Sequence, residues 1–203
     1  MIDTRTKMQL GIDLGTTYSV AAQLDEDGRP SVVRNNEGDE KTPSVVQIRE
    51  DETLVGTPAV NERLLSLDET IERVKRHMGD EDWTVDINGT SYTPEEISAR
   101  ILAKIKADVE QETGEEISEV VITVPADFGL KENEATLNAA IGAGFNEENG
   151  FDTEDDISLL KEPIAASMRY GADATGETLF VYDLGGGTFD ATIVEVTEDD
   201  DDE

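Results

Sequence analysis

The stretch IDLGTT at residues 12–17 decides the fold of this chain, because its pattern recurs as YDLGGGTFD at residues 182–190. Each copy follows an apolar run that is typical of a buried strand, and each leads into a second such run. The four runs are Leu10–Leu14 with Tyr18–Leu24, and Thr178–Leu184 with Phe189–Val196. The sequence therefore predicts two units in which a tight glycine turn joins two strands.

The residues around the two glycine turns favour phosphate binding. Glycine lets backbone N–H groups approach an anion closely, and the neighbouring threonine hydroxyls add hydrogen bonds. Asp13 and Asp183 precede the turns, and a hydrated divalent cation prefers such carboxylate oxygens. Neither turn is a Walker-type loop, because no Gly-Lys-Ser/Thr follows and no helix is predicted to start there. A single Asp-Leu-Gly is as readily a plain hairpin turn, but two copies in register favour a phosphate clamp.

The two turns resemble the phosphate motifs of the DnaK-type seventy-kilodalton heat-shock chaperones, at residues 11–17 and 181–190 of this sequence. Further stretches resemble the family in the same order along the chain. These are Glu37–Ser44, Val74–Gly79, Val120–Ala126 and Glu162–Ala166. The resemblance covers nearly the whole chain and implies an α/β fold of the actin-like ATPase (ribonuclease H-like) type.

The resemblance also implies a domain organisation. Residues 1–176 are expected to form the first lobe of the ATPase domain, with residues 44–93 as its smaller subdomain. Residues 177–203 are expected to form the opening hairpin of a second lobe. We expect the rest of that lobe, the hydrophobic linker and the substrate-binding domain to be absent from this chain.

Local patterns predict helices that alternate with strands, as an α/β fold requires. A capping box starts a helix at Thr93 that ends at Gly114, a second helix begins near Leu130, and Pro163 opens a third. Runs of β-branched residues predict buried strands between them, connected as mostly parallel neighbours. The predicted buried faces are Ile97, Ile101, Leu102, Ile105 and Val109 in the first helix, and Leu137, Ala140, Ile141 and Gly144 in the second.

By resemblance, the chain carries a site for ATP or ADP with Mg²⁺, and its chemistry is phosphoryl transfer to water. Asp13 and Asp183 would face the magnesium ion through its water molecules. The residues that would hold the phosphates are Gly15, Thr16, Thr17, Tyr18, Gly185, Gly186, Gly187 and Thr188. The residues that would be catalytic are Lys75, Glu162, Asp183 and Thr188, and Asp190 would support the second turn.

Lys75 is predicted to lie on a helix, where it differs from its basic neighbours. At the i,i+4 spacing of a helix, Arg73 would pair with Glu69 and Arg76 with Glu72. Lys75 has an isoleucine at that spacing, so its charge is available to a distant anion, and it matches the family's catalytic lysine. The single histidine, His77, is expected to be a plain surface residue.

Glu162 occupies the predicted N-cap of the third helix, where Asn, Asp, Ser or Thr would be preferred. A locally suboptimal residue suggests another task, and the family's matching glutamate helps organise the metal and the attacking water. The chain also departs from the family. Arginine is replaced by Asn133, tyrosine by Asp127, asparagine by Lys161 and threonine by Ile164.

Two classes of function remain open from the sequence. The first is an ATP-binding, ATP-hydrolysing module of a DnaK-type chaperone that is involved in protein folding, acts on unfolded clients only indirectly and is completed by another polypeptide. The second is a non-catalytic acidic binding or interaction protein derived from the same fold. A sugar kinase or an actin-like filament protein is a weaker third alternative.

The composition bounds the remaining possibilities. Asp and Glu number 48 against 16 Lys and Arg, giving a formal net charge of −32. This charge is typical of a halophilic surface, where salt screens self-repulsion, and it disfavours nucleic acid as a partner. The chain has no cysteine, which excludes disulfides and thiolate metal sites. No apolar signal or membrane span is seen in the sequence, so we expect a cytoplasmic protein with no membrane partner.

Overall fold

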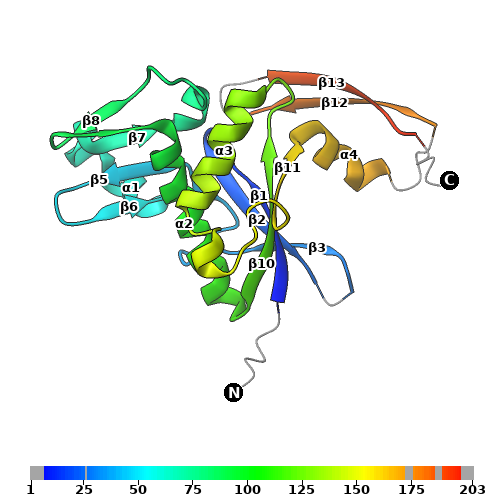
Figure 1. Cartoon of the computed structure of the whole chain (residues 1–203), viewed down its shortest axis with the longest axis horizontal. Helices are drawn as coiled ribbons and strands as arrows, with labels where there is room; N and C mark the ends of the chain where they lie inside the picture. Colours follow the sequence, from blue (N-terminus) through cyan, green and yellow to red (C-terminus); the bar gives the residue numbers. More distant parts are fainter. Residues whose placement is uncertain (1–6, 26, 172–175, 186–188, 198–203) are drawn as a thin grey trace.

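A mixed six-stranded sheet forms the centre of the computed structural model, which describes residues 7–25, 27–171, 176–185 and 189–197 (Figure 1). The strand order is β11-β10-β1-β2-β3, and β4 also pairs with β2. The strands β11, β10 and β1 are parallel, whereas β2, β3 and β4 run antiparallel to their neighbours. Their bounds are β1 (Lys7–Asp13), β2 (Tyr18–Leu24), β3 (Pro30–Val33), β4 (Thr42–Pro43), β10 (Glu116–Val124) and β11 (Ile157–Lys161). The predicted α/β class is confirmed.

Two helices pack side by side against this sheet (Figure 1). The helix α2 (Pro94–Thr113) begins with the predicted capping box and ends at Gly114 in the left-handed conformation. All five of its predicted core residues are buried. The predicted inward face of the neighbouring helix α3 (Leu130–Gly142) is confirmed in part, because Ala140 is buried and Leu137 packs partly buried against the core. Its buried residues are Ala135, Thr136, Ala139 and Ala140, whereas Ile141 is exposed.

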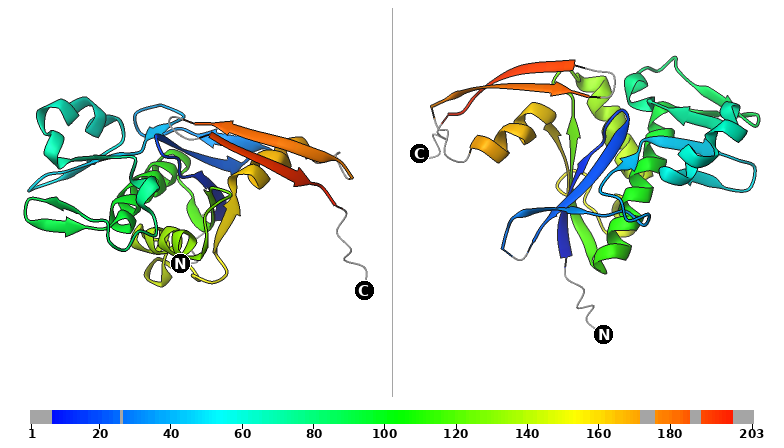
Figure 2. Two further views of the ribbon diagram at one scale, coloured as in Figure 1. Left: turned by 90° about the horizontal axis from the view of Figure 1, so that it is seen from above. Right: turned by 180° about the vertical axis from the view of Figure 1, so that it is seen from behind.

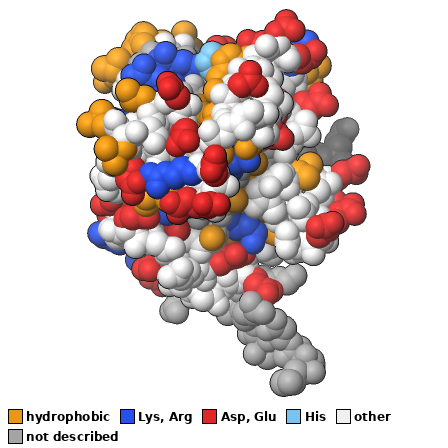
Figure 3. Space-filling model, turned by 90° about the vertical axis from the view of Figure 1, so that its left-hand side faces the viewer, with side chains coloured by type: hydrophobic (Ala, Val, Ile, Leu, Met, Phe, Trp, Pro, Cys, Tyr) orange, Lys and Arg blue, Asp and Glu red, His pale blue; other side chains and the backbone are white. Residues whose placement is uncertain are grey.

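Residues 44–93, which were expected to form a smaller subdomain, contain mainly short strands and turns. A three-stranded antiparallel sheet has the order β6-β5-β7, and β8 pairs with β9 across the Asn88-Gly89 turn. The acidic side chains are spread over its outer face, and hydrophobic side chains gather along one edge of that face (Figure 3). The elements are β5 (Val45–Ile48), β6 (Thr53–Val55), α1 (Thr57–Glu62), β7 (Thr70–Glu72), β8 (Val85–Ile87), β9 (Thr90–Tyr92) and the 3₁₀ turns Arg63–Leu65, Leu67–Glu69 and Val74–His77.

The predicted helix around Lys75 is wrong. Residues Thr70–Glu72 form strand β7, Arg73 takes the left-handed conformation with φ 60°, and only the 3₁₀ turn Val74–His77 follows. Pairing of β7 with the fully buried strand β5 outweighs the local helical pattern. The i,i+4 pairs therefore do not form, and Glu72 instead accepts a hydrogen bond from Arg63.

The remaining elements lie beyond the sheet. A 3₁₀ turn, Glu147–Asn149, lies in the largely exposed acidic loop before β11. The helix α4 (Glu162–Gly171) follows β11, and the antiparallel hairpin β12 (Thr178–Leu184) and β13 (Phe189–Glu195) lies beside it (Figure 2). No helix in the described ranges is long and apolar enough to span a bilayer.

Candidate functional site

A cavity of about 560 Å³ opens at the carboxyl ends of the three parallel strands. In sheets of this kind that edge is where ligands bind. The first glycine turn, the 3₁₀ turn that carries Lys75, the loop after β10, helix α4 and the end of β12 all contribute to its wall. The lining residues are Asp13, Gly15, Thr16, Thr17, Tyr18, Lys75, Arg76, Thr123, Pro125, Asp127, Phe128, Glu162, Ala165, Ala166, Asp183 and Gly185.

The first glycine turn is sharp. A Cβ atom on Gly15 would lie 2.1 Å from the carbonyl oxygen of Tyr18, so only glycine fits this turn. The hydroxyl of Thr17 is buried and has no hydrogen-bond partner among the described residues. A buried hydroxyl normally has such a partner, so Thr17 is the residue of this turn with an unsatisfied polar atom.

Two aspartates reach the cavity from opposite sides. The hydroxyl of Thr123 donates to Asp13 Oδ1 at 3.0 Å and fixes this carboxylate, because Thr123 is its register partner on the adjacent parallel strand. Asp183 lies near the end of β12, next to Gly185. No cluster of three or more metal-binding side chains exists in the described part of the chain. Two carboxylates fit magnesium, which keeps several of its water molecules, better than an ion bound by protein ligands alone.

Lys75 and Glu162 form an ion pair at the centre of this wall. Lys75 Nζ donates to Glu162 Oε1 at 2.6 Å, and the two side chains are only 9% and 21% exposed. The ammonium group also lies 5.9 Å from the centre of the Phe128 ring. The loop that carries this ring is fixed by Lys161, whose Nζ donates to the backbone carbonyl oxygens of Pro125 and Phe128 at 3.2 and 2.6 Å.

The electrostatics of Glu162 reflect its crowded position. Burial raises the pKa of its carboxyl group, and the attraction of Lys75 opposes that rise without cancelling it. The negative charges of Asp13 and Asp183 raise this pKa further. The three carboxylates therefore lie close enough to repel one another, and a bound cation would relieve that repulsion.

The structure brings most of the predicted site residues together. Gly15, Thr16, Thr17 and Tyr18 line the same cavity as Asp13, Lys75, Glu162, Asp183 and Gly185. Gly186, Gly187 and Thr188 lie outside the described residues, as does the side chain of Asp190. His77 does not line the cavity but stacks on Trp83, with ring centroids 4.5 Å apart.

Several cavity residues were not singled out from the sequence. Thr123 could be found only from the register of the sheet, because it lies opposite Asp13 in the parallel pair of β1 and β10. Arg76 and Phe128 reach the cavity from a turn and a loop, whose paths local patterns do not predict.

The chain is similar to known chaperones. A sequence profile of the family described as "Hsp70 protein" matches residues 9–86 and, in a second match, residues 80–199. Proteins described as "Chaperone protein DnaK" from two strains of Halobacterium salinarum are each 48% identical to the chain over 186 residues, or 91% of it. The chain spans 28% of the length of these relatives.

Proposed function

The chain belongs to the Hsp70 family, and we propose that it is an ATP-binding and ATP-hydrolysing module of a DnaK-type chaperone. The observation that carries the proposal is the single cavity that collects Asp13, the first glycine turn, the Lys75–Glu162 pair and Asp183. These groups come from four separate segments of the chain, at residues 13–18, 75, 162 and 183. Their meeting at the carboxyl edge of the sheet suits a nucleotide triphosphate chain.

The residues of the cavity have distinct proposed roles. The turn Gly15–Tyr18 presents backbone N–H groups and hydroxyls to the phosphates, and Gly186, Gly187 and Thr188 would do the same from the second turn. Lys75 offers a preorganised positive charge to the transferred phosphoryl group. Glu162 would accept a hydrogen bond from the attacking water, and Thr188 would help to place that water. Asp13 and Asp183 would hold magnesium through water, and the ion when bound would offset phosphate charge.

A partner polypeptide forms the second part of the proposal. The hairpin β12–β13 presents Phe180 opposite Ile193 and Leu184 opposite Phe189, and all four side chains are 62–78% exposed. Such an apolar face on an isolated hairpin invites a covering surface. We propose that a polypeptide supplying the rest of the ATPase fold covers it, and that unfolded clients are reached only through that assembly. The cytoplasmic location expected from the sequence belongs to this proposal.

Two measurements test the proposal: equilibrium binding of ATP and the release of phosphate from it. In molar KCl with magnesium, the chain should bind ATP, and either alone or with its partner it should release phosphate. Binding without release under both conditions would favour the non-catalytic binding protein. Absence of both would contradict the proposal.

A further inference from the structure

The segment Glu37–Ser44 resembles the family but lies outside the cavity wall, and it has a direct connection to the first glycine turn. Ser44 Oγ donates to the carbonyl oxygen of Gly15 at 2.7 Å, and the backbone N–H of Ser44 donates to the carbonyl oxygen of Thr17 at 2.9 Å. Ser44 therefore holds the turn at both ends. Its side chain does so from a buried position, 3% exposed.

A second serine completes this contact. Ser19 Oγ lies 3.0 Å from Ser44 Oγ and is 1% exposed. A hydroxyl has one proton to donate, and Ser44 gives its proton to Gly15, so Ser19 is the donor between the two serines. The network runs from Ser19 in β2 through Ser44 to the carbonyl oxygen of Gly15 in the turn.

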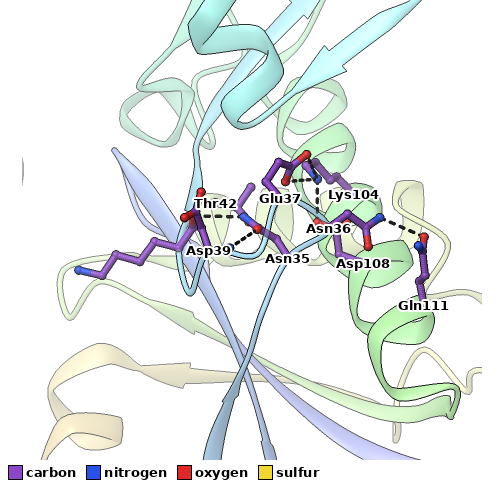
Figure 4. Close-up of polar contacts among 9 residues, drawn as sticks. Asn35, Asn36, Glu37, Asp39, Thr42, Lys104, Asp108 and Gln111 are labelled. Carbon is purple, nitrogen blue, oxygen red and sulfur yellow. Dashed lines mark hydrogen bonds and ion pairs between the residues drawn. The ribbon is translucent and has the colours of Figure 1, made fainter.

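The segment that carries Ser44 is fastened at its other end to helix α2 (Figure 4). Lys104 Nζ donates to Glu37 Oε2 at 3.0 Å and to Asp108 Oδ2 at 2.7 Å, and the three side chains are 14%, 24% and 5% exposed. Asn36 adds a hydrogen bond to Gln111 at 3.1 Å. We call the Lys104–Glu37–Asp108 contacts the α2 clamp.

The loop between the α2 clamp and Ser44 is closed on itself. Asn35 Nδ2 donates to Thr42 Oγ1 at 3.1 Å, and the backbone N–H of Asp39 donates to Asn35 Oδ1 at 2.8 Å. Thr42 then enters β4, which pairs with β2 directly before Ser44. A rigid connection thus extends from α2 to the glycine turn.

We propose that Ser44 is a positioning residue for the first phosphate turn and that the α2 clamp holds it in place. Ser44 acts through Gly15 and Thr17 and touches no nucleotide itself. The proposal rests on the proposed phosphate-binding function of that turn. Loss of the Ser44 hydroxyl frees the carbonyl of Gly15, so the turn should open more often and bind phosphate less well.

Hydrogen exchange at the amides of residues 15–18 tests this without a ligand. Ser44→Ala should speed exchange there, and Ser44→Thr, which keeps a hydroxyl, should restore much of the protection. The matched control is Ser98→Ala, because Ser98 is similarly buried at 1% exposed but donates to the Met78 sulfur and does not line the cavity. Unchanged exchange in Ser44→Ala, or an equal change in Ser98→Ala, would overturn the proposal.

Binding of magnesium tripolyphosphate gives the second measurement. Ser44→Ala should bind it roughly two- to tenfold more weakly than the unmodified chain, as the loss of one hydrogen bond implies, whereas Ser98→Ala should not. If the unmodified chain does not bind tripolyphosphate, the proposed function fails, and the exchange measurement still decides the role of Ser44.

A third variant tests the α2 clamp. Glu37→Gln weakens the ion pair with Lys104 and should speed exchange at residues 15–18 less than Ser44→Ala does. Its control is Glu81→Gln, in an exposed ion pair with Lys131. Exchange that is unchanged by Glu37→Gln would overturn the part of the proposal that concerns the clamp.

Discussion

Lys75 and Glu162 are 87 positions apart in the sequence, yet Lys75 Nζ lies 2.6 Å from Glu162 Oε1. One residue comes from a 3₁₀ turn of the smaller subdomain and the other from the start of α4. Their contact joins the smaller subdomain to the part of the chain that carries the hairpin. It also places a buried positive charge beside the carboxylates of a cavity that Arg76 lines as well, and positive charge there favours binding of a phosphate chain.

Replacement of Lys75 should affect hydrolysis far more than stability. If hydrolysis is measured, Lys75→Met should lower its rate by about 10²-fold or more, since one preorganised donor typically contributes that much. Glu162 loses its partner, but its side chain is 21% exposed, so the stability loss should be below the roughly 3–5 kcal/mol of a fully buried pair. Phosphate release and denaturant unfolding measure the two effects.

The control for Lys75 is Lys131→Met. Lys131 also pairs with a glutamate, Glu81, but both side chains are at least 70% exposed, and such pairs contribute little. Equal rates for Lys75→Met and Lys131→Met would show that Lys75 is not catalytic.

The raised pKa of Glu162 predicts a particular pH dependence of stability. Because the folded pKa lies above the unfolded value, the folded chain binds the proton more tightly. We compare the free energy of unfolding of the unmodified chain with that of Glu162→Gln. The difference in favour of the unmodified chain should be largest below about pH 4.3, the ordinary glutamate pKa. The advantage should be lost as the pH rises through the folded pKa. Denaturant unfolding of both proteins across this range measures the difference, and a difference that grows with pH would contradict the assignment.

The first glycine turn should not tolerate a side chain. Gly15→Ala forces a Cβ to within 2.1 Å of the Tyr18 carbonyl oxygen, so the turn must move, at a cost of about 1–3 kcal/mol or more. Gly11→Ala, in the preceding strand, meets its nearest neighbour at 3.7 Å and should be nearly neutral. Thermal unfolding compares the two variants. Equal stability would mean that the turn is looser than its geometry indicates.

Salt should stabilise the fold strongly. With a net charge of −32, self-repulsion acts over a Debye length of about 30 Å at 0.01 M salt but only about 3 Å at 1 M. Circular dichroism in a KCl series should show cooperative unfolding in molar salt and loss of structure in dilute buffer. A melting temperature that does not change with salt would contradict the halophilic interpretation.

The sequence predicts those parts of the fold that short-range rules determine. The β2 and β12 bounds, the α2 capping box and the stop at Gly114 agree with the structure, because strand propensity and capping depend on neighbouring residues. The turn around Lys75 was mispredicted because its conformation depends on β7 joining β5, a contact made far along the chain. The inward face of α3 likewise depends on α2.

The candidate site shows the same division. Asp13, Lys75, Glu162 and Asp183 were predicted through motifs and family resemblance, and the structure places them on one cavity. The role of Thr123 required the parallel register of β1 and β10, and the contact of Ser44 with Gly15 required the path of a loop. Neither the pairing of Thr123 with Asp13 nor the contact of Ser44 with Gly15 can be predicted from the pattern of neighbouring residues. The division of the chain into lobes at residue 176 remains a prediction.

Titration calorimetry with ATP, GTP and tripolyphosphate, each with magnesium in molar KCl, tests the central claim most directly. The described wall of the cavity carries the first glycine turn, hydroxyls, carboxylates, Lys75 and Arg76, with Phe128 as its one large apolar ring, so we expect phosphate contacts to dominate binding. The account predicts that all three ligands bind with similar affinity and that Lys75→Met weakens all three alike. Failure of all three to bind, or a strong preference for ATP that Lys75→Met leaves unchanged, would contradict it.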